Sequence, residues 1–305
     1  YKHDLPSTQN MNRICFIIIV LLFFSNAVAQ HRIGLTVDGA TAWQLDDVEI
    51  TTPKTGGNVG IGMIYQYQKG RFLLNTGVNF SSSCLSQVVD SQHIAVPMRD
   101  TEGINFIYRG ELYNRHDQIA TADISIPFML GAKTSFGLYA LGGVRLILPL
   151  HAKSFQHALL TTKGDYGNRY HEMLENLPQH GYFTALSVKN DGIVKFPIDL
   201  RIGAEFGYAI PMETRFQKTT LSQIQIGAFI EYGVLNSLTN GSNLLTEVDC
   251  SQYMQVTMHH VYTTLSKQDH YVHPLSVGIR LSILWQTHAS RSFGIYWELD
   301  GQNEI

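Results

Sequence analysis

The chain of 305 residues carries 22 Lys and Arg against 25 Asp and Glu, and this net charge of −3 argues against nucleic acid as a partner. Charged residues make up only 15% of the chain, below the ~25% of ordinary soluble domains, while aromatic residues reach 11%. No segment after residue 30 has the ~20 apolar residues that a membrane helix needs. This composition predicts an exported, β-rich protein of one domain.

The first 29 residues predict a targeting region. Residues 1–10 are polar and are expected to lie upstream of the mature protein. Arg13 gives a positively charged start after Met11, an apolar run follows at 14–24, and Ala27 and Ala29 supply small residues for cleavage. This order predicts a secretory signal peptide over 11–29, with a non-cleaved anchor as the alternative. No cysteine follows the small residues, which disfavours a lipoprotein anchor.

Eight segments between residues 30 and 287 alternate between apolar and small or polar side chains with a period of two, which is typical of β-strands. In the segment 196–210 every charge lies on one face, and nearly every large apolar group lies on the other. The eight segments lie at about 32–43, 58–67, 71–80, 121–133, 136–148, 196–210, 221–234 and 275–285.

Strand length and connection length separate a membrane barrel from a soluble sandwich. The segments are long enough for the ~9–11 residues of a tilted membrane strand, whereas soluble strands usually have about five or six. Short connections at 69–70, 134–135 and 211–219 alternate with long ones at 45–56, 82–117, 150–195 and 236–273. The pattern predicts an all-β fold, a transmembrane antiparallel up-and-down β-barrel of about eight strands over 30–287, in the outer membrane. It also predicts long extracellular loops and both chain ends in the periplasm.

Nine charged residues lie on the small-residue faces of these strands, and an eight-strand barrel is only wide enough for its own side chains. Because unpaired buried charges are costly, we expect a lumenal charge network that seals the barrel rather than a conducting pore or a catalytic pair of carboxylates. The nine residues are Arg71, Asp123, Lys133, Arg145, Asp199, Arg201, Glu205, Glu231 and Arg280.

The segments DISIPFMLGAK (123–133) and FPIDLRIGAEFGY (196–208) resemble strands of the outer-membrane β-barrel proteins of Bacteroidota, the PorT-like group. The resemblance implies insertion by the barrel assembly machinery, contact with outer-membrane lipid and, for some members, a link to type IX secretion. Such barrels often end at an aromatic residue, whereas here a tail at 288–305 follows Trp285. Either this tail is periplasmic, or the stretch 292–299 belongs to the barrel, so the strand count is eight or ten.

The long loops hold the remaining candidates for chemistry. Cys84 and Cys250 could form a disulfide between two loops on the exported side, with two free thiols as the alternative. Histidines gather in the loops, but none has the spacing of a known metal site, and no cofactor is expected. They include His151, His157, His171, His180, His259, His260, His270 and His273.

An enzyme is the second class of function. Loop residues such as Ser154, His157, Asp165, His171 and Glu172 offer nucleophile and base types, but no spacing singles out a pair. We therefore expect no catalysis, and we expect the large loops to serve structural or binding roles with a protein or glycan partner. A component of protein secretion and a lipid-modifying enzyme are the alternatives.

Overall fold

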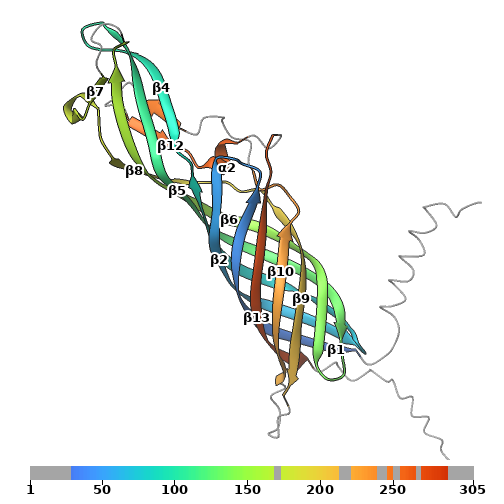
Figure 1. Ribbon diagram of the computed structural model, residues 1–305. Helices are drawn as coiled ribbons and strands as arrows, with labels where there is room; N and C mark the ends of the chain where they lie inside the picture. Colours follow the sequence, from blue (N-terminus) through green and yellow to red (C-terminus); the bar gives the residue numbers. More distant parts are fainter. Residues whose placement is uncertain are drawn as a thin grey trace, which may run out of the picture.

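The computed structural model describes residues 29–167, 173–212, 221–238, 246–249, 255–265 and 269–287. Within this part of the chain, eight antiparallel strands pair in a closed ring, because the last strand pairs with the first (Figure 1). The predicted strand count of eight is therefore confirmed. In ring order the strands are β1 (Gln30–Asp46), β2 (Thr51–Lys69), β3 (Phe72–Val89), β5 (Asn105–Lys133), β6 (Leu138–Asp165), β9 (Asp199–Pro211), β10 (Leu221–Gly233) and β13 (Val272–Thr287).

The short connections and both ends of the ring lie at one end of the barrel. Gln30 pairs with Gln68 beside the turn at 70–71, where Gly70 has a φ of 59°. The ring closes at Thr287, so the barrel needs no residue of the tail at 288–305. That tail, the predicted signal peptide and residues 1–10 lie outside the described residues, apart from Ala29. Within the described part of the chain, no helix has the length and apolarity needed to cross a membrane.

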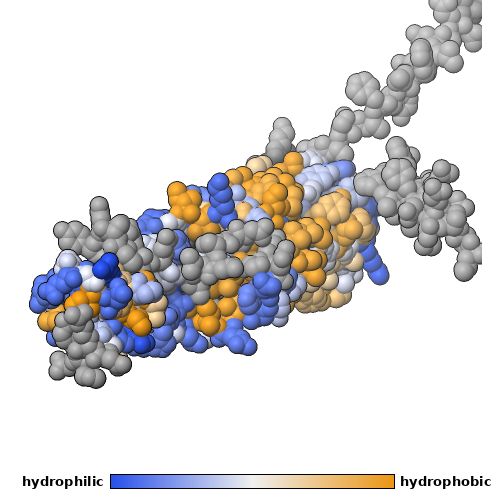
Figure 2. Space-filling view, turned by 90° about the horizontal axis from the view of Figure 1, so that it is seen from above, coloured by the Kyte–Doolittle hydropathy of each residue, from blue (hydrophilic) through white to orange (hydrophobic). Residues whose placement is uncertain are grey.

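The barrel is apolar on the outside. Val59, Met63, Phe206 and Ile279 are each at least 60% exposed. On the face seen in Figure 2, hydrophobic residues gather over the barrel and hydrophilic residues cluster at the left end of the view. Such exposure is unfavourable in water and favourable in lipid.

Aromatic side chains mark the two edges of this apolar surface. Tyr65 and Trp285 both pair with Ile33 near the turn end, while Trp43 pairs with Leu275 near the opposite end. At about 3.3 Å per residue and a strand tilt of about 40°, the stretch 33–43 covers about 25 Å of barrel height, which matches the apolar band of membrane barrels.

Of the four segments expected as long loops, three are largely strand, and in the first of them, 45–56, β1 continues to Asp46 and β2 begins at Thr51. β3 continues to Val89, β4 (Gln92–Arg99) extends its path, and β5 and β6 have 29 and 28 residues. The predicted loops at 82–117 and 150–195 are thus mostly sheet. Their alternation persists, but polar residues replace apolar ones on the outer face, so the membrane pattern no longer identifies them.

These strands form a sheet that rises beyond the barrel (Figure 1), hereafter the extension: β4, residues 105–115 of β5, residues 153–165 of β6, β7 (Met173–Glu175) and β8 (Leu186–Ile193). At about 3.4 Å per residue, the stretch 105–115 carries the sheet about 30 Å past the barrel mouth. A short 3-10 helix, η2 (Pro178–His180), lies between β7 and β8.

Two β-bulges separate barrel from extension. The β5–β6 register shifts between Tyr113 and His116 of β5 and again between Ala122 and Asp123, opposite Pro149 and His151. In the first bulge Asn114 has a φ of 51°. Each bulge reverses which alternate residues of a strand face inward.

The last long segment returns to the mouth and to the inner face of the extension. It contains β11 (Thr246–Asp249), β12 (Gln255–Met258) and the helical turn α2 (Val261–Thr264). Met258 packs with Leu112 and Leu160 of the extension. Val261 and Tyr262 pack with Val48 in the connection between β1 and β2 and with Val89 and Ile119 of β3 and β5, so α2 covers the mouth.

Candidate functional site

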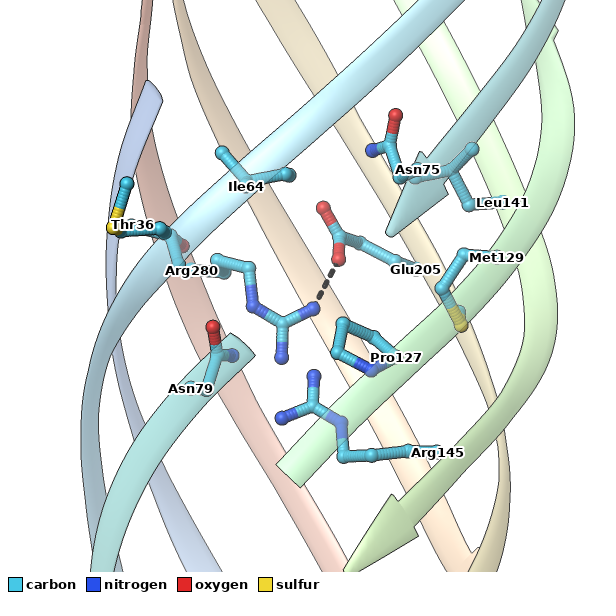
Figure 3. A pocket seen from close by; sticks show the side chains of 11 residues that line it. Thr36, Ile64, Asn75, Asn79, Pro127, Met129, Leu141, Arg145, Glu205 and Arg280 are labelled. Atoms are coloured by element: carbon cyan, nitrogen blue, oxygen red, sulfur yellow. Dashed lines mark hydrogen bonds and ion pairs between the residues drawn. The ribbon is translucent and has the colours of Figure 1, made fainter. Parts of the chain in front are cut away.

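The barrel lumen is filled by an ion-pair network centred on Arg280 of β13 (Figure 3). Its guanidinium donates to Glu205 of β9 at 2.5 Å and lies 3.5 Å from the carboxylates of Asp38 on β1 and Glu231 on β10. Arg145 of β6 reaches the same Glu231 carboxylate at 3.0 Å. One arginine therefore joins four strands across the lumen, counting its own.

A hydrogen-bonded layer lies nearer the turn end. Gln66 accepts from Arg32 at 3.1 Å and from Gln223 at 2.7 Å, and it donates to Asn75 at 3.0 Å. Lys133 donates to Gln223 at 2.8 Å. This layer ties β1, β2, β3, β5 and β10 together around a neutral amide core.

Of the nine residues predicted for the lumenal network, Arg71 lies elsewhere, and two further charged residues that the prediction omits lie in the lumen. Arg71 is exposed in the turn between β2 and β3, because β3 begins one residue later at Phe72. Arg32 and Asp38 of β1 are each only 7% exposed and lie in the lumen, although neither is among the nine predicted residues. With Arg71 removed and these two added, five basic residues face five acidic ones.

The cavities within this network are small. One holds about 20 Å³ beside Arg280 and Asn79, and another holds about 10 Å³ beside Asp38, Arg201 and Glu231. A single water needs roughly 10–15 Å³, so each has room for about one water molecule. Buried polar atoms without a partner among the described residues, such as Arg145 Nε and Asp199 Oδ1, suit such waters.

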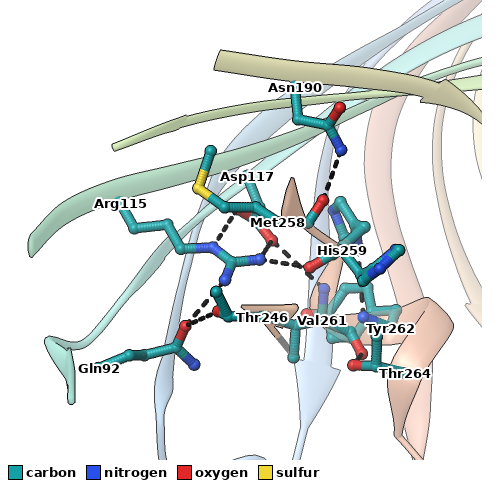
Figure 4. Close-up of polar contacts among 11 residues, drawn as sticks. Gln92, Arg115, Asp117, Asn190, Thr246, Met258, His259, Val261, Tyr262 and Thr264 are labelled. Atoms are coloured by element: carbon teal, nitrogen blue, oxygen red, sulfur yellow. Dashed lines mark hydrogen bonds and ion pairs between the residues drawn. The ribbon is translucent and has the colours of Figure 1, made fainter. Parts of the chain in front are cut away.

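A second polar cluster lies above the mouth, where Arg115 and Asp117 of β5 form a fully buried ion pair with N–O distances of 2.8 and 2.9 Å (Figure 4). Arg115 also donates to Gln92 at 2.9 Å and to the carbonyl oxygen of His259. The Val261 amide donates to Asp117 at 3.3 Å. The pair therefore fixes the segment 255–265 against the sheet.

His260 and Tyr262 complete this cluster. His260 is the N-cap of α2 and accepts from the Tyr262 amide at 3.2 Å. Burial lowers the pKa of His260 to about 4, although the nearby Asp117 acts in the opposite sense. Burial and a hydrogen bond to Asp46 raise the pKa of Tyr262, whose hydroxyl donates to that carboxylate. Both side chains are therefore neutral at pH 7.

A cavity of about 420 Å³ opens between the sheet of the extension and the segment 255–265. Ser154 and Gln156 of β6 form one wall, Asn190 of β8 and the stretch 192–195 form another, and Met258 to His260 close the third. Sequence reasoning missed this site because its walls come from segments far apart in the chain.

The other sequence candidates are not brought together. Ser154 faces inward on β6, whereas His157 bonds Ser187 and Asp165 pairs with Arg109 on the outer face. The Arg109 hydrogen bond lowers the pKa of Asp165. His171 and Glu172 lie outside the described residues, as does Cys250, so the predicted disulfide stays a prediction. Cys84 lies on β3 beside Gln118.

The histidines of the predicted loops are scattered as well. His259 and His260 line the large cavity, His151 and His157 lie on β6, and His180 lies in η2. His270 lies 3.5 Å from Asp47, and His273 bonds the carbonyl of Gly233. Within the described ranges, no three His, Cys, Asp or Glu side chains gather as a metal site would require.

Comparisons with known proteins return a few solved barrels. A scan against protein-family models finds no match, and no curated protein matches. The attachment invasion locus protein Ail of Yersinia pestis is 11% identical over 83% of this chain and 99% of that chain, with a TM-score of 0.27. Ail in complex with the heparin analogue sucrose octasulfate gives 10% identity, the same coverage and a TM-score of 0.24.

The translocator domain of the autotransporter NalP from Neisseria meningitidis is 10% identical over 92% of this chain and 96% of that chain, with a TM-score of 0.20. TM-scores this low carry no weight in assigning the fold, which rests on the strand pairing itself. A closed eight-strand ring, an apolar exterior bounded by aromatic side chains and a charge-paired interior have one physical explanation. The chain is a β-barrel protein of the outer membrane.

Proposed function

We propose that this protein is a surface-binding protein, in which the barrel anchors the extension and the extension contacts a protein or glycan outside the cell. The observation that carries the proposal is the continuity of β5 and β6 from the membrane into the extension. A binding surface on a rigid sheet loses less conformational entropy on binding than a flexible loop does.

The extension has a packed interior of its own. Phe106 stacks on Tyr166 at a centroid distance of 4.8 Å, and Tyr108 packs against Tyr182. Lys163 pairs with Glu175 at 2.6 Å on the outer face. Apolar residues inside and ion pairs outside are features of a sheet that is folded in water.

The lumen supports the same division of roles. Among the described residues, the cavities beside this four-strand network hold about 20 and 10 Å³, which is too little for a solute. Transport through the barrel would require the Arg280 contacts to break. We therefore assign the activity to the extension and expect neither conduction nor catalysis.

Membership of the PorT-like group belongs to this proposal as a sequence-based prediction, with the biogenesis partner it implies. The barrel assembly machinery would insert the chain, and outer-membrane lipid would cover the apolar band. A link to type IX secretion rests on the same resemblance alone.

Two measurements test the proposal. The purified protein in lipid nanodiscs is applied to an array of surface glycans and of exported proteins, beside a variant whose extension is shortened at 93–112 and 157–189. We expect at least one array component to bind the full chain and not the shortened variant, which should keep its heat-modifiable gel migration. Equal binding by both proteins, or none by either, would contradict the proposal, as would steady conductance in planar bilayers.

A further inference from the structure

The 420 Å³ cavity above the mouth has the size of a small-molecule site. Ligand pockets usually span about 300–1,000 Å³, so this one has room for a sugar of one or two residues. The cavity lies above the mouth, where the inner face of the extension meets the segment 255–265.

The lining of the cavity combines polar side chains with the apolar Ile193, Val194 and Met258, and it includes no carboxylate among the described residues. Gln156 is only 3% exposed, and its Oε1 has no hydrogen-bond partner among the described residues. An unpaired buried amide oxygen costs about 1–3 kcal/mol, so a donor from a bound molecule would recover that loss. Ser154 adds a hydroxyl on the same strand.

Lys195 gives the cavity its charge. It lies at the rim on the stretch that follows β8, and no ion pair joins it to another residue of the described ranges. Two other lysines of the sheet are neutralised by partners, since Lys153 is paired with Asp191 at 2.9 Å and Lys163 with Glu175. An exposed cation beside hydrogen-bonding walls favours an anionic, hydroxyl-bearing ligand.

The third wall is held in place before any ligand arrives. Arg115 binds the carbonyl oxygen of His259, and the Asn190 side-chain amide donates to the carbonyl oxygen of Met258 at 2.5 Å. The two contacts approach the segment from β5 and from β8. A cavity with walls fixed from both sides needs little rearrangement on binding.

We propose that this cavity binds a small acidic sugar, with Lys195 holding the carboxylate and Gln156 accepting from a hydroxyl. The proposal deepens the proposed function and rests on it only in treating the extension as the binding region. The sugar could be free in solution or the end of a longer glycan, and the two sources share this chemistry.

The test uses the full chain in nanodiscs, with binding followed by ligand-observed NMR titration. D-glucuronic acid is compared with D-glucose, inorganic phosphate and an oligosaccharide that ends in glucuronic acid. We expect glucuronic acid to bind about tenfold more tightly than glucose and phosphate. Tighter binding of the oligosaccharide would indicate a glycan end as the source, and equal binding would indicate the free sugar.

Two matched variants locate the site. Lys195→Gln should remove the preference for glucuronic acid over glucose, whereas Lys189→Gln on β8, outside the cavity, should keep it. Equal binding of the two sugars, tighter binding of phosphate, or an unchanged preference in Lys195→Gln would overturn the proposal. Loss of array binding by the shortened extension variant, in the absence of sugar binding, would refute the sugar site and leave the proposed function standing.

Discussion

The barrel and the extension share two strands, but the barrel places polar side chains inside and apolar ones outside, whereas the extension does the reverse. On β5, Asp123 and Ser125 point into the lumen while Phe128 faces lipid. Further up the same strand, Tyr108 and Leu112 are buried and Arg109 lies outside. An apolar outer face is favourable in lipid and a polar outer face is favourable in water. A single strand therefore changes which of its faces is apolar where it leaves the membrane.

The bulges make this change possible. The shift between Tyr113 and His116 moves the inward positions of β5 from odd to even numbers. The buried Arg115–Asp117 pair lies just on the barrel side of this shift, where neither lipid nor open water is available. The barrel and the extension are therefore stable for different reasons, and four perturbations test this difference.

The largest effect is expected for Arg280→Ala. The change leaves the carboxylates of Glu205, Glu231 and Asp38 in the lumen without their shared cation, and breaking a buried pair costs about 3–5 kcal/mol. The free energy of unfolding, measured by urea titration in lipid vesicles, should fall by that amount. Lys133→Ala is the control, because Lys133 bonds the neutral Gln223 and its loss should cost about 1 kcal/mol. Equal losses in both variants would contradict a charge-centred barrel.

Arg115→Ala should act on the segment 255–265 above the mouth and leave the barrel intact. The change leaves the buried Asp117 carboxylate without its cation and removes the hydrogen bond from Arg115 to the His259 carbonyl. We therefore expect the protection of amides against hydrogen exchange to fall by about 3 kcal/mol, only in the segment 255–265. Hydrogen exchange should report the loss, while the heat-modifiable gel shift stays unchanged. The double variant Arg115→Leu with Asp117→Leu should recover most of it, since no charge is left unpaired. A loss of barrel stability in the single variant would show that the two regions fold as one.

The sequence predicts the barrel well because lipid and lumen impose one strict pattern on every strand. Eight strands, their outward faces and eight of the nine lumenal charges follow from it. Arg71 fails because alternation does not show where a turn ends and a strand begins; Gly70, with its positive φ, marks that turn. Arg32 and Asp38 share the parity of the lumenal residues on β1 and could have been found by reading both faces of that strand.

The extension and its cavity could not be predicted in the same way. Its strands alternate, but bulges at Tyr113 and near Pro149 reverse the alternation partway along β5 and β6. The cavity brings together Gln156, Lys195 and His259, whose proximity depends on how the segment 255–265 folds back. That return depends on the buried Arg115–Asp117 pair, which lies in the segment 82–117 that the sequence predicts as a loop.

A matched pair of substitutions compares the two environments on one strand. Ile126 and Ile107 both lie on the outer face of β5, at 41% and 39% exposure. Ile126→Lys places a charge in lipid and should cost about 2–3 kcal/mol in vesicle unfolding. Ile107→Lys places it in water and should change stability by no more than about 0.5 kcal/mol. Similar costs at the two positions would mean that the membrane boundary on β5 is misplaced.

The smallest expected effect is a pH dependence confined to the mouth. The unfolded pKa of histidine is about 6.5, and burial lowers that of His260 to about 4, so the open state of the segment binds the proton more tightly. Its stability is fully present above pH 6.5 and declines as the pH falls toward 4. Between pH 7.5 and 5.5 the protection of the amides at 261–265 should drop about tenfold, or about 1.4 kcal/mol. Hydrogen exchange at the two pH values, corrected for intrinsic rates, measures this drop.

The variant His260→Asn is the control, because asparagine keeps an N-cap acceptor but does not titrate. Its hydrogen exchange should therefore lose most of the pH dependence. An equal drop in that variant would assign the effect to another group.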